Sequence, residues 1–258
     1  RMKKMGKRLA KKVLLIGWDA ADWKVINPLM DSGQMPALEK LVNGGTIGKI
    51  ATLDPPLSPM LWTSIATGKR PYKHGVLGFT EPKPDMSGIQ PVLSSSRKVK
   101  AIWNILSERD FKTHVVGWWP SHPAENINGI SISNFYQKDS DTKDGEWLMA
   151  QGAVSPEDRT DFFEKLRVHP RELTQAHILP FVPDAAKVDQ SKDRNIYKIS
   201  KFVAHSASIQ AAATYILEHE EWDFMAVYFD AIDHFCHQFM KYHPPKLDKV
   251  ADEEFETY

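Results

Sequence analysis

Short apolar runs alternate with amphipathic stretches along the whole chain. Apolar runs over residues 11–19, 112–119 and 222–229 predict buried strands, because each is short and is closed by an acidic residue or a proline. A further strand is predicted over residues 46–53, which a pair of prolines follows. The chain therefore offers several strands that lie far apart in sequence.

Helical periodicity occupies the segments between these runs. Helices are predicted over residues 22–31, 36–42, 58–67, 100–110 and 195–218, with weaker ones near 156–167 and 171–178. Residues 80–98 are rich in Pro, Ser and Gly and predict an excursion loop. Strands that alternate with helices predict an α/β fold, in which a mostly parallel sheet carries helices on both faces.

The same pattern predicts how the chain is divided. Residues 1–12 are rich in Lys and Arg and are expected to form a basic, flexible arm. Residues 13–120 and 194–258 are expected to form one α/β core. Residues 121–193 show no clean alternation of strands and helices, so we expect an irregular, partly helical insertion that caps one end of the sheet. A chain of 258 residues is long enough for one sizeable core and such an insertion.

Composition narrows the class of protein. Lys and Arg number 33, as do Asp and Glu, so no nucleic-acid partner is expected. The apolar run behind the basic arm, residues 13–16, is shorter than the roughly 7–15 residues of a signal sequence. No stretch approaches the ~20 apolar residues of a membrane span, and the single cysteine, Cys236, excludes an internal disulfide. These features predict a soluble cytoplasmic protein without a transmembrane segment, and they leave the oligomeric state open.

Three reactive side chains follow the predicted strands. Asp19 ends the first strand, Ser58 follows the second, and Asp233 follows the last. Ligands of such sheets bind beyond the carboxyl ends of the strands, where these residues are expected to meet. Ser58 also starts a helix, where free N–H groups favour an anion. The alternatives are that Ser58 is only a helix N-cap before Pro59 and that Asp19 caps the next helix.

Two Asp–His pairs lie close together after the last strand. Asp233 and His237 have i, i+4 spacing, which on a helix directs a carboxylate and an imidazole to one metal ion. Asp230 and His234 have the same spacing, so spacing alone does not choose between the pairs. An ordinary amphipathic helix with its polar face in water is the alternative.

Taken together, three motifs resemble the type I phosphodiesterase/nucleotide pyrophosphatase branch of the alkaline-phosphatase superfamily: WDAADW, LSPMLWTSIATGKRPYKHGVLGF and VYFDAIDHFCHQF. The resemblance implies a metal-dependent hydrolase of small-molecule phosphate esters, with two divalent ions, zinc or else manganese or iron. It implies that Ser58 is the nucleophile at the metals, that Asp19 binds one metal, and that Asp233 and His237 bind the other.

Several positions depart from the patterns of relatives. Phe79 stands where nucleotide pyrophosphatases carry a phosphate-contacting Asn, so nucleotides are not the expected substrates. Sulfatases of the same superfamily carry Pro two residues and Arg four residues after the nucleophile. This chain has Met60 and Trp62 at those positions, which argues against a sulfatase. The later motif that completes the family's metal ligands is not found, so the chain is expected to be the amino-terminal part of a longer enzyme. The alternatives are a phosphomonoesterase or phosphotransferase of the same superfamily, or an inactive fragment or binding module.

Overall fold

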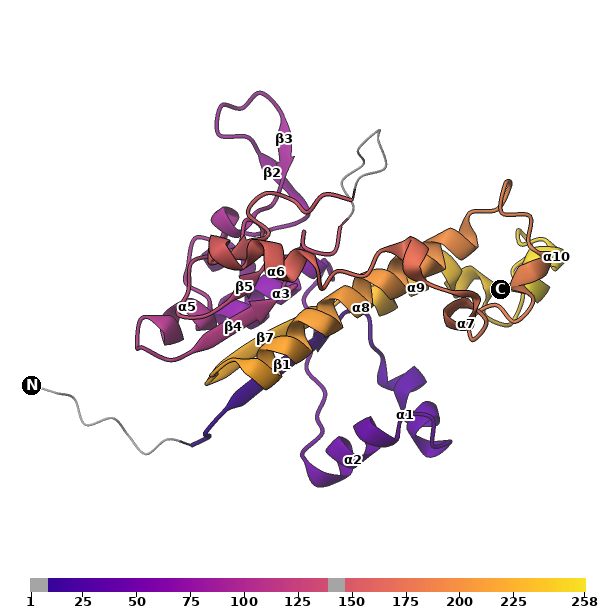
Figure 1. Ribbon diagram of the computed structural model, residues 1–258, viewed down its shortest axis with the longest axis horizontal. Coiled ribbons are helices and arrows are strands. Elements are labelled where there is room, and N and C mark those ends of the chain that lie inside the picture. The colour runs from indigo at the N-terminus through magenta and orange to yellow at the C-terminus, as the bar shows by residue number, and fades with distance from the viewer. Residues whose placement is uncertain (1–8, 139–146) are drawn as a thin grey trace, which may run out of the picture.

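The fold is built on a five-stranded sheet, seen in a computed structural model that describes residues 9–138 and 147–258 (Figure 1). In spatial order the strands are β1 (Val13–Trp18), β7 (Phe224–Phe229), β4 (Thr113–Val116), β5 (Ser131–Ile132) and β6 (Val154–Ser155). The first four run parallel and β6 runs antiparallel to β5. This arrangement confirms the predicted α/β class with a mostly parallel sheet.

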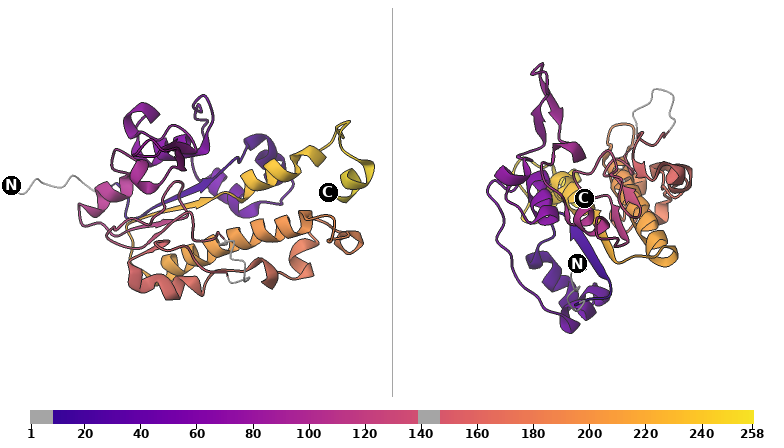
Figure 2. Two further views of the ribbon diagram at one scale, coloured as in Figure 1. Left: turned by 90° about the horizontal axis from the view of Figure 1, so that it is seen from above. Right: turned by 90° about the vertical axis from the view of Figure 1, so that its left-hand side faces the viewer.

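Helices pack on both faces of the sheet, and the alternation of side chains along β7 shows which helix lies on which face. Met225 and Val227 join a core cluster with the long helix α8 (Asn195–His219). Phe224, Ala226 and Tyr228 join another cluster with α3 (Ser58–Thr67) and α5 (Ile102–Ser107). Successive strand residues face opposite sides, so α8 covers one face and α3 and α5 the other (Figure 2).

The remaining elements surround this core. The other helices are α1 (Trp23–Asp31), α2 (Pro36–Gly44), α4 (Pro71–His74), α6 (Thr160–Glu164), α7 (Gln175–Ile178), α9 (Ala231–Phe239) and α10 (Asp252–Thr257). Short 3₁₀ turns are η1 (Ser94–Ser96), η2 (Glu157–Arg159), η3 (Pro170–Glu172), η4 (Ala185–Lys187) and η5 (Met240–Tyr242). A third apolar cluster joins α7, the first half of α8 and α9. Within the described ranges, no helix is long and apolar enough to cross a bilayer.

The strand predicted over residues 46–53 is wrong. This segment is irregular, and Ile47 and Ile50 are exposed. Its largest apolar side chains do not fall on one face of a strand, because Ile50 would point away from the side that carries Ile47 and Leu53. The free edge of β1 consequently has no strand beside it among the described residues.

Other segments also differ from the sequence pattern. The predicted loop over residues 80–98 contains an antiparallel hairpin of β2 (Thr80–Pro82) and β3 (Ile89–Pro91), which projects from the body (Figure 1). The predicted insertion, residues 121–193, supplies β5 and β6 to the sheet. The division into domains stays a prediction, and most of the predicted basic arm lies outside the described residues.

Candidate active site

The carboxyl ends of β1 and β7 bring two candidate segments together. The strands are paired in register, with Trp18 opposite Phe229. The Asp19 N–H continues this pairing and donates to the Phe229 carbonyl at 3.0 Å. Asp19 therefore lies beside the start of α9, which carries Asp233 and His237.

Asp19 is buried, at 9% exposure, and its carboxylate is held by three donors. Oδ1 accepts from Trp62 Nε1 at 3.1 Å and from the Ala20 N–H at 3.1 Å. Oδ2 accepts from the Tyr228 hydroxyl at 2.7 Å. The role of N-cap of α1, left open by the sequence, belongs instead to Asp22, which accepts from the Lys24 N–H.

Tyr228 stays protonated in this setting. Burial raises its pKa, and the neighbouring charge of Asp19 raises the pKa further. Its hydroxyl is therefore a donor, and Oδ2 of Asp19 is its acceptor. Sequence patterns did not predict a role in the site for Tyr228 or Trp62. Their only signals were that Tyr228 lies in the strand before Asp230 and that Trp62 follows Ser58 by one helical turn.

The two Asp–His pairs of the α9 segment are both formed, with different surroundings. Asp233 Oδ1 lies 3.5 Å from His237 Nε2, and Asp230 Oδ2 lies 3.6 Å from His234 Nε2. Burial raises the pKa of Asp233, and the charge of Asp19 raises it further. The His234 ring instead lies edge-on to Phe202 of α8. Asp233 is therefore close enough to Asp19 to feel its charge, whereas His234 packs toward α8.

Ser58 is the first residue of α3, and Leu57 is its N-cap. The predicted N-cap at Ser58 and first helical position at Pro59 are therefore wrong by one residue, because Ser58 already has helical backbone geometry. Trp62 lies four residues later on the same face of α3 and donates to Asp19. Helical spacing therefore predicts that Ser58 lies on the same side of α3 as Trp62, about one turn, or ~5.4 Å along the axis, before it. Ser58 makes no hydrogen bond to Asp19, Asp233 or His237 among the described residues, so its place in the site stays a prediction.

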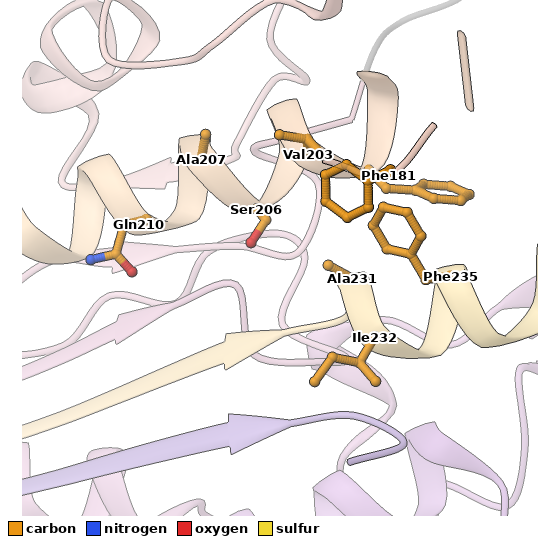
Figure 3. Close-up of a pocket in the computed structure, with 9 residues that line it drawn as sticks. Phe181, Val203, Ser206, Ala207, Gln210, Ala231, Ile232 and Phe235 are labelled. Carbon is orange, nitrogen blue, oxygen red and sulfur yellow. The ribbon is translucent and has the colours of Figure 1, made fainter. Parts of the chain in front are cut away.

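An apolar pocket of about 460 Å³ lies between α8 and α9 (Figure 3). From α9 it is lined by Ala231, Ile232 and Phe235, whose spacing places them on one face of the helix. Asp233 and His237 lie on the opposite face. The pocket is therefore separate from the candidate active site.

The donor set fits only part of a divalent-metal site. Asp233 and His237 offer a carboxylate and an imidazole that suit zinc, manganese or iron, and Asp19 offers a second carboxylate nearby. Among the described residues, however, no group of three His, Cys, Asp or Glu side chains is close enough to enclose one ion. A complete two-metal site is therefore not formed by these residues alone, and the assignment of metal ligands stays a prediction.

A comparison with protein families identifies the group to which this fold and these motifs belong. Residues 13–254 match the profile of the type I phosphodiesterase/nucleotide pyrophosphatase family. The chain belongs to this family. The resemblance inferred from the three motifs is thereby confirmed, and it covers almost the whole chain.

A solved structure agrees with the fold of this family member. Phosphonoacetate hydrolase from Sinorhizobium meliloti 1021, in complex with phosphonoacetate, is similar with a TM-score of 0.51 at 14% identity. The similarity covers 86% of this chain and 47% of that one, so the chain spans about half the length of this relative. Its complex with phosphonoformate has a TM-score of 0.49, with the same identity and coverage. No curated protein matches the chain.

Proposed function

We propose that the chain provides the nucleophile and part of the metal ligands of a phosphoric ester hydrolase of the phosphodiesterase type. One observation carries this proposal: Asp19 and Asp233, from motifs at opposite ends of the chain, lie near the ends of the paired strands β1 and β7, close enough for the charge of Asp19 to raise the pKa of Asp233. Like charges held near one another disfavour the ionised form of a carboxyl group, and a divalent cation between them would relieve this repulsion. Membership of the family supplies the reaction class.

In this proposal each residue has a separate task. Asp19 holds one divalent metal ion, and Asp233 with His237 holds a second; zinc suits these ligands best, with manganese or iron as alternatives. When bound, the metal supplies Lewis-acid polarisation of the phosphoryl group. The first N–H groups of α3 bind a phosphoryl oxygen of the small-molecule ester.

Ser58 is the proposed nucleophile. Its Oγ forms a bond to phosphorus while the bond from phosphorus to the leaving oxygen breaks, and the proton of the Ser58 hydroxyl ends on the leaving oxygen. The leaving group departs as an alcohol, and a phosphoseryl enzyme is left. Water then attacks the same phosphorus, which releases phosphate or a phosphate monoester and restores the Ser58 hydroxyl.

The substrate class is narrowed by one aromatic contact. Phe79 is half-exposed and its ring packs against Trp119, with the ring centroids 5.3 Å apart. Phe79 has no polar group to offer a phosphoryl oxygen at the position where nucleotide pyrophosphatases carry Asn. We therefore propose phosphate esters other than nucleotides. Phosphonoacetate, the ligand of the relative, has a phosphorus–carbon bond in place of the ester bond, and it is tested for comparison.

The test is hydrolysis of bis(p-nitrophenyl) phosphate, p-nitrophenyl phosphate and phosphonoacetate with zinc or manganese present. The assay is run on this chain and, if the natural protein is longer, on the full-length protein as well. In the active form, Ser58→Ala is expected to lower kcat by roughly a thousandfold or more, because the attacking oxygen is removed. Thr67→Ala, at the other end of the same helix, is the control and is expected to keep its activity.

Two results would contradict the proposal. Full activity of Ser58→Ala would exclude Ser58 as the nucleophile. Failure of the active form to take up zinc, manganese or iron, measured by elemental analysis after dialysis, would exclude the metal-dependent mechanism.

A further inference from the structure

We infer that Tyr228 and Trp62 are positioning residues that hold the Asp19 carboxylate for a metal ion and leave Oδ2 as the ligating atom. This inference rests on the proposed function, because it requires Asp19 to be a metal ligand. It goes further by naming the residues behind that ligand and the oxygen that binds.

The count of lone pairs on the carboxylate selects Oδ2. A carboxylate oxygen has about two acceptor directions. Oδ1 already accepts from Trp62 Nε1 and from the Ala20 N–H, so both of its directions are used. Of the three donors, only the Tyr228 hydroxyl donates to Oδ2. One direction on Oδ2 therefore stays open, and a cation bound to Asp19 is expected to be bound through this atom.

The charge of Asp19 is also uncompensated. Asp19 is buried, and none of the ion pairs between described residues includes it. Its three donors are neutral groups. A buried carboxylate that has hydrogen bonds but no counter-charge keeps its attraction for a cation. A structural carboxylate of the core would more commonly be paired with Arg or Lys.

Both donors are fixed by aromatic packing. The Trp62 ring lies edge-on to Tyr228 at 4.8 Å and to Trp118 at 5.5 Å between ring centroids. Trp118 Nε1 in turn donates to the Trp62 carbonyl at 3.2 Å. The indole also needs Gly17, since a Cβ there would lie 2.6 Å from a ring carbon of Trp62. The carboxylate is thus oriented before any metal arrives, which lowers the entropy that metal binding costs.

The backbone after Asp19 supports the same arrangement. Ala20 has a left-handed backbone, with φ of 60°, which is uncommon for a residue with a side chain. In this conformation the Ala20 N–H donates to Asp19 Oδ1. Unusual backbone geometry that persists at one point requires support from its surroundings, and it is frequent at functional sites.

The experiment compares the zinc affinity of variants that lack the Tyr228 hydroxyl or the Trp62 indole N–H. Zinc affinity is measured by competition with a chromogenic chelator for Tyr228→Phe and Trp62→Phe, in the form of the protein that binds metal. Partners of metal ligands typically contribute 10–100-fold to metal affinity, so each variant is expected to bind zinc about 10–100-fold more weakly. The Trp62 indole N–H resonance, assigned from its loss in Trp62→Phe, is expected to shift when metal binds.

Tyr136→Phe is the matched control. Tyr136 is also buried, and its hydroxyl also makes one hydrogen bond, to the Phe163 carbonyl at 2.8 Å. This control removes the same chemical group at a place away from Asp19, so zinc affinity is expected to stay unchanged. In an Asp19→Asn background, Tyr228→Phe is expected to have no additional effect on zinc affinity.

The results separate this inference from the function on which it rests. If Asp19→Asn does not weaken zinc binding, the metal role of Asp19 in the proposed function is wrong. If Asp19→Asn weakens binding while Tyr228→Phe and Trp62→Phe both match the Tyr136→Phe control, only the positioning role is wrong. If Tyr228→Phe does not fold, Trp62→Phe and the indole resonance decide the matter.

Discussion

His114 illustrates how a single residue of the sheet makes stability depend on pH. It is buried in β4, where its Nε2 donates to the Glu221 carbonyl at 3.0 Å. Its Nδ1 accepts from the Ile130 N–H at 2.9 Å. A ring that accepts at Nδ1 is neutral, and burial lowers the pKa of His114 below its ordinary value of 6.5. The folded protein therefore binds fewer protons at this ring than the unfolded chain just below pH 6.5.

We predict that the free energy of unfolding falls as the pH drops below about 6.5, because protons then favour the unfolded chain. Above that pH, His114 makes its full contribution to the free energy of unfolding. As the pH falls from there to the pKa of His114 in the folded protein, this contribution is lost at up to about 1.4 kcal/mol per pH unit. His114→Gln, which keeps an amide donor and acceptor, is expected to reduce this slope in urea unfolding between pH 5 and 7. Some slope is expected to stay, because burial also lowers the pKa of His74.

The same substitution at the exposed His219 is the control, because its Nδ1 donates to the Tyr215 carbonyl and a protonated ring can still donate there. It is expected to leave the slope as in the parent protein. An unchanged slope in His114→Gln would contradict the assigned role of this ring.

At the scale of elements, α8 connects two separate apolar clusters. Its first half contributes Ile196 and Ile199 to the cluster with α7 and α9. Its second half contributes Ile209 and Ile216 to the cluster on the sheet. A single helix of 25 residues thereby links the segment that carries Asp233 to the face of the sheet.

We predict that Ile216→Ala lowers the free energy of unfolding by about 2–5 kcal/mol, because Ile216 is fully buried and its truncation leaves a cavity. Urea unfolding measures the change. Glu218→Ala, two residues later on the exposed side of α8, is the control and is expected to change stability by less than about 0.5 kcal/mol. Similar losses in both variants would mean that α8 does not pack on the sheet as described.

At the scale of the whole molecule, β1 is an edge strand of the sheet and carries exposed apolar side chains. In register, Leu14, Ile16 and Trp18 lie opposite Met225, Val227 and Phe229 of β7, which pack in the cluster with α8. Yet Leu14, Ile16 and Trp18 are 41%, 51% and 37% exposed. An edge strand with exposed apolar side chains is a site of association.

We therefore predict that this chain self-associates with increasing concentration and binds the dye ANS, and that Ile16→Lys weakens both. Sedimentation velocity and dye fluorescence measure the two effects. Ile65→Lys is a matched control, because Ile65 is also 51% exposed but lies on α3 and not on the strand edge. Equal effects of the two substitutions, or no association of the parent chain, would contradict the prediction.

The sequence alone determined the elements whose signals are local. The apolar run of β1, the periodicity of α8 and the end of α3 at residue 67 are all present as predicted. Gly68, directly after α3, has the left-handed backbone that favours glycine. Such signals depend on residues that are neighbours along the chain. Three motifs were also specific enough to identify the family, and the alternation of elements was sufficient for the fold class.

Only the tertiary structure decided which strands are neighbours and which side chains contact Asp19. The pairing of β1 with β7 joins segments about two hundred residues apart and brings Asp19 to the start of α9. It also revealed Tyr228 and Trp62 as donors to Asp19, and it left residues 46–53 without a strand. These outcomes depend on contacts between segments that no local pattern encodes. A carboxylate at a strand end is therefore visible in the sequence, whereas the hydrogen bonds that orient it are set by packing.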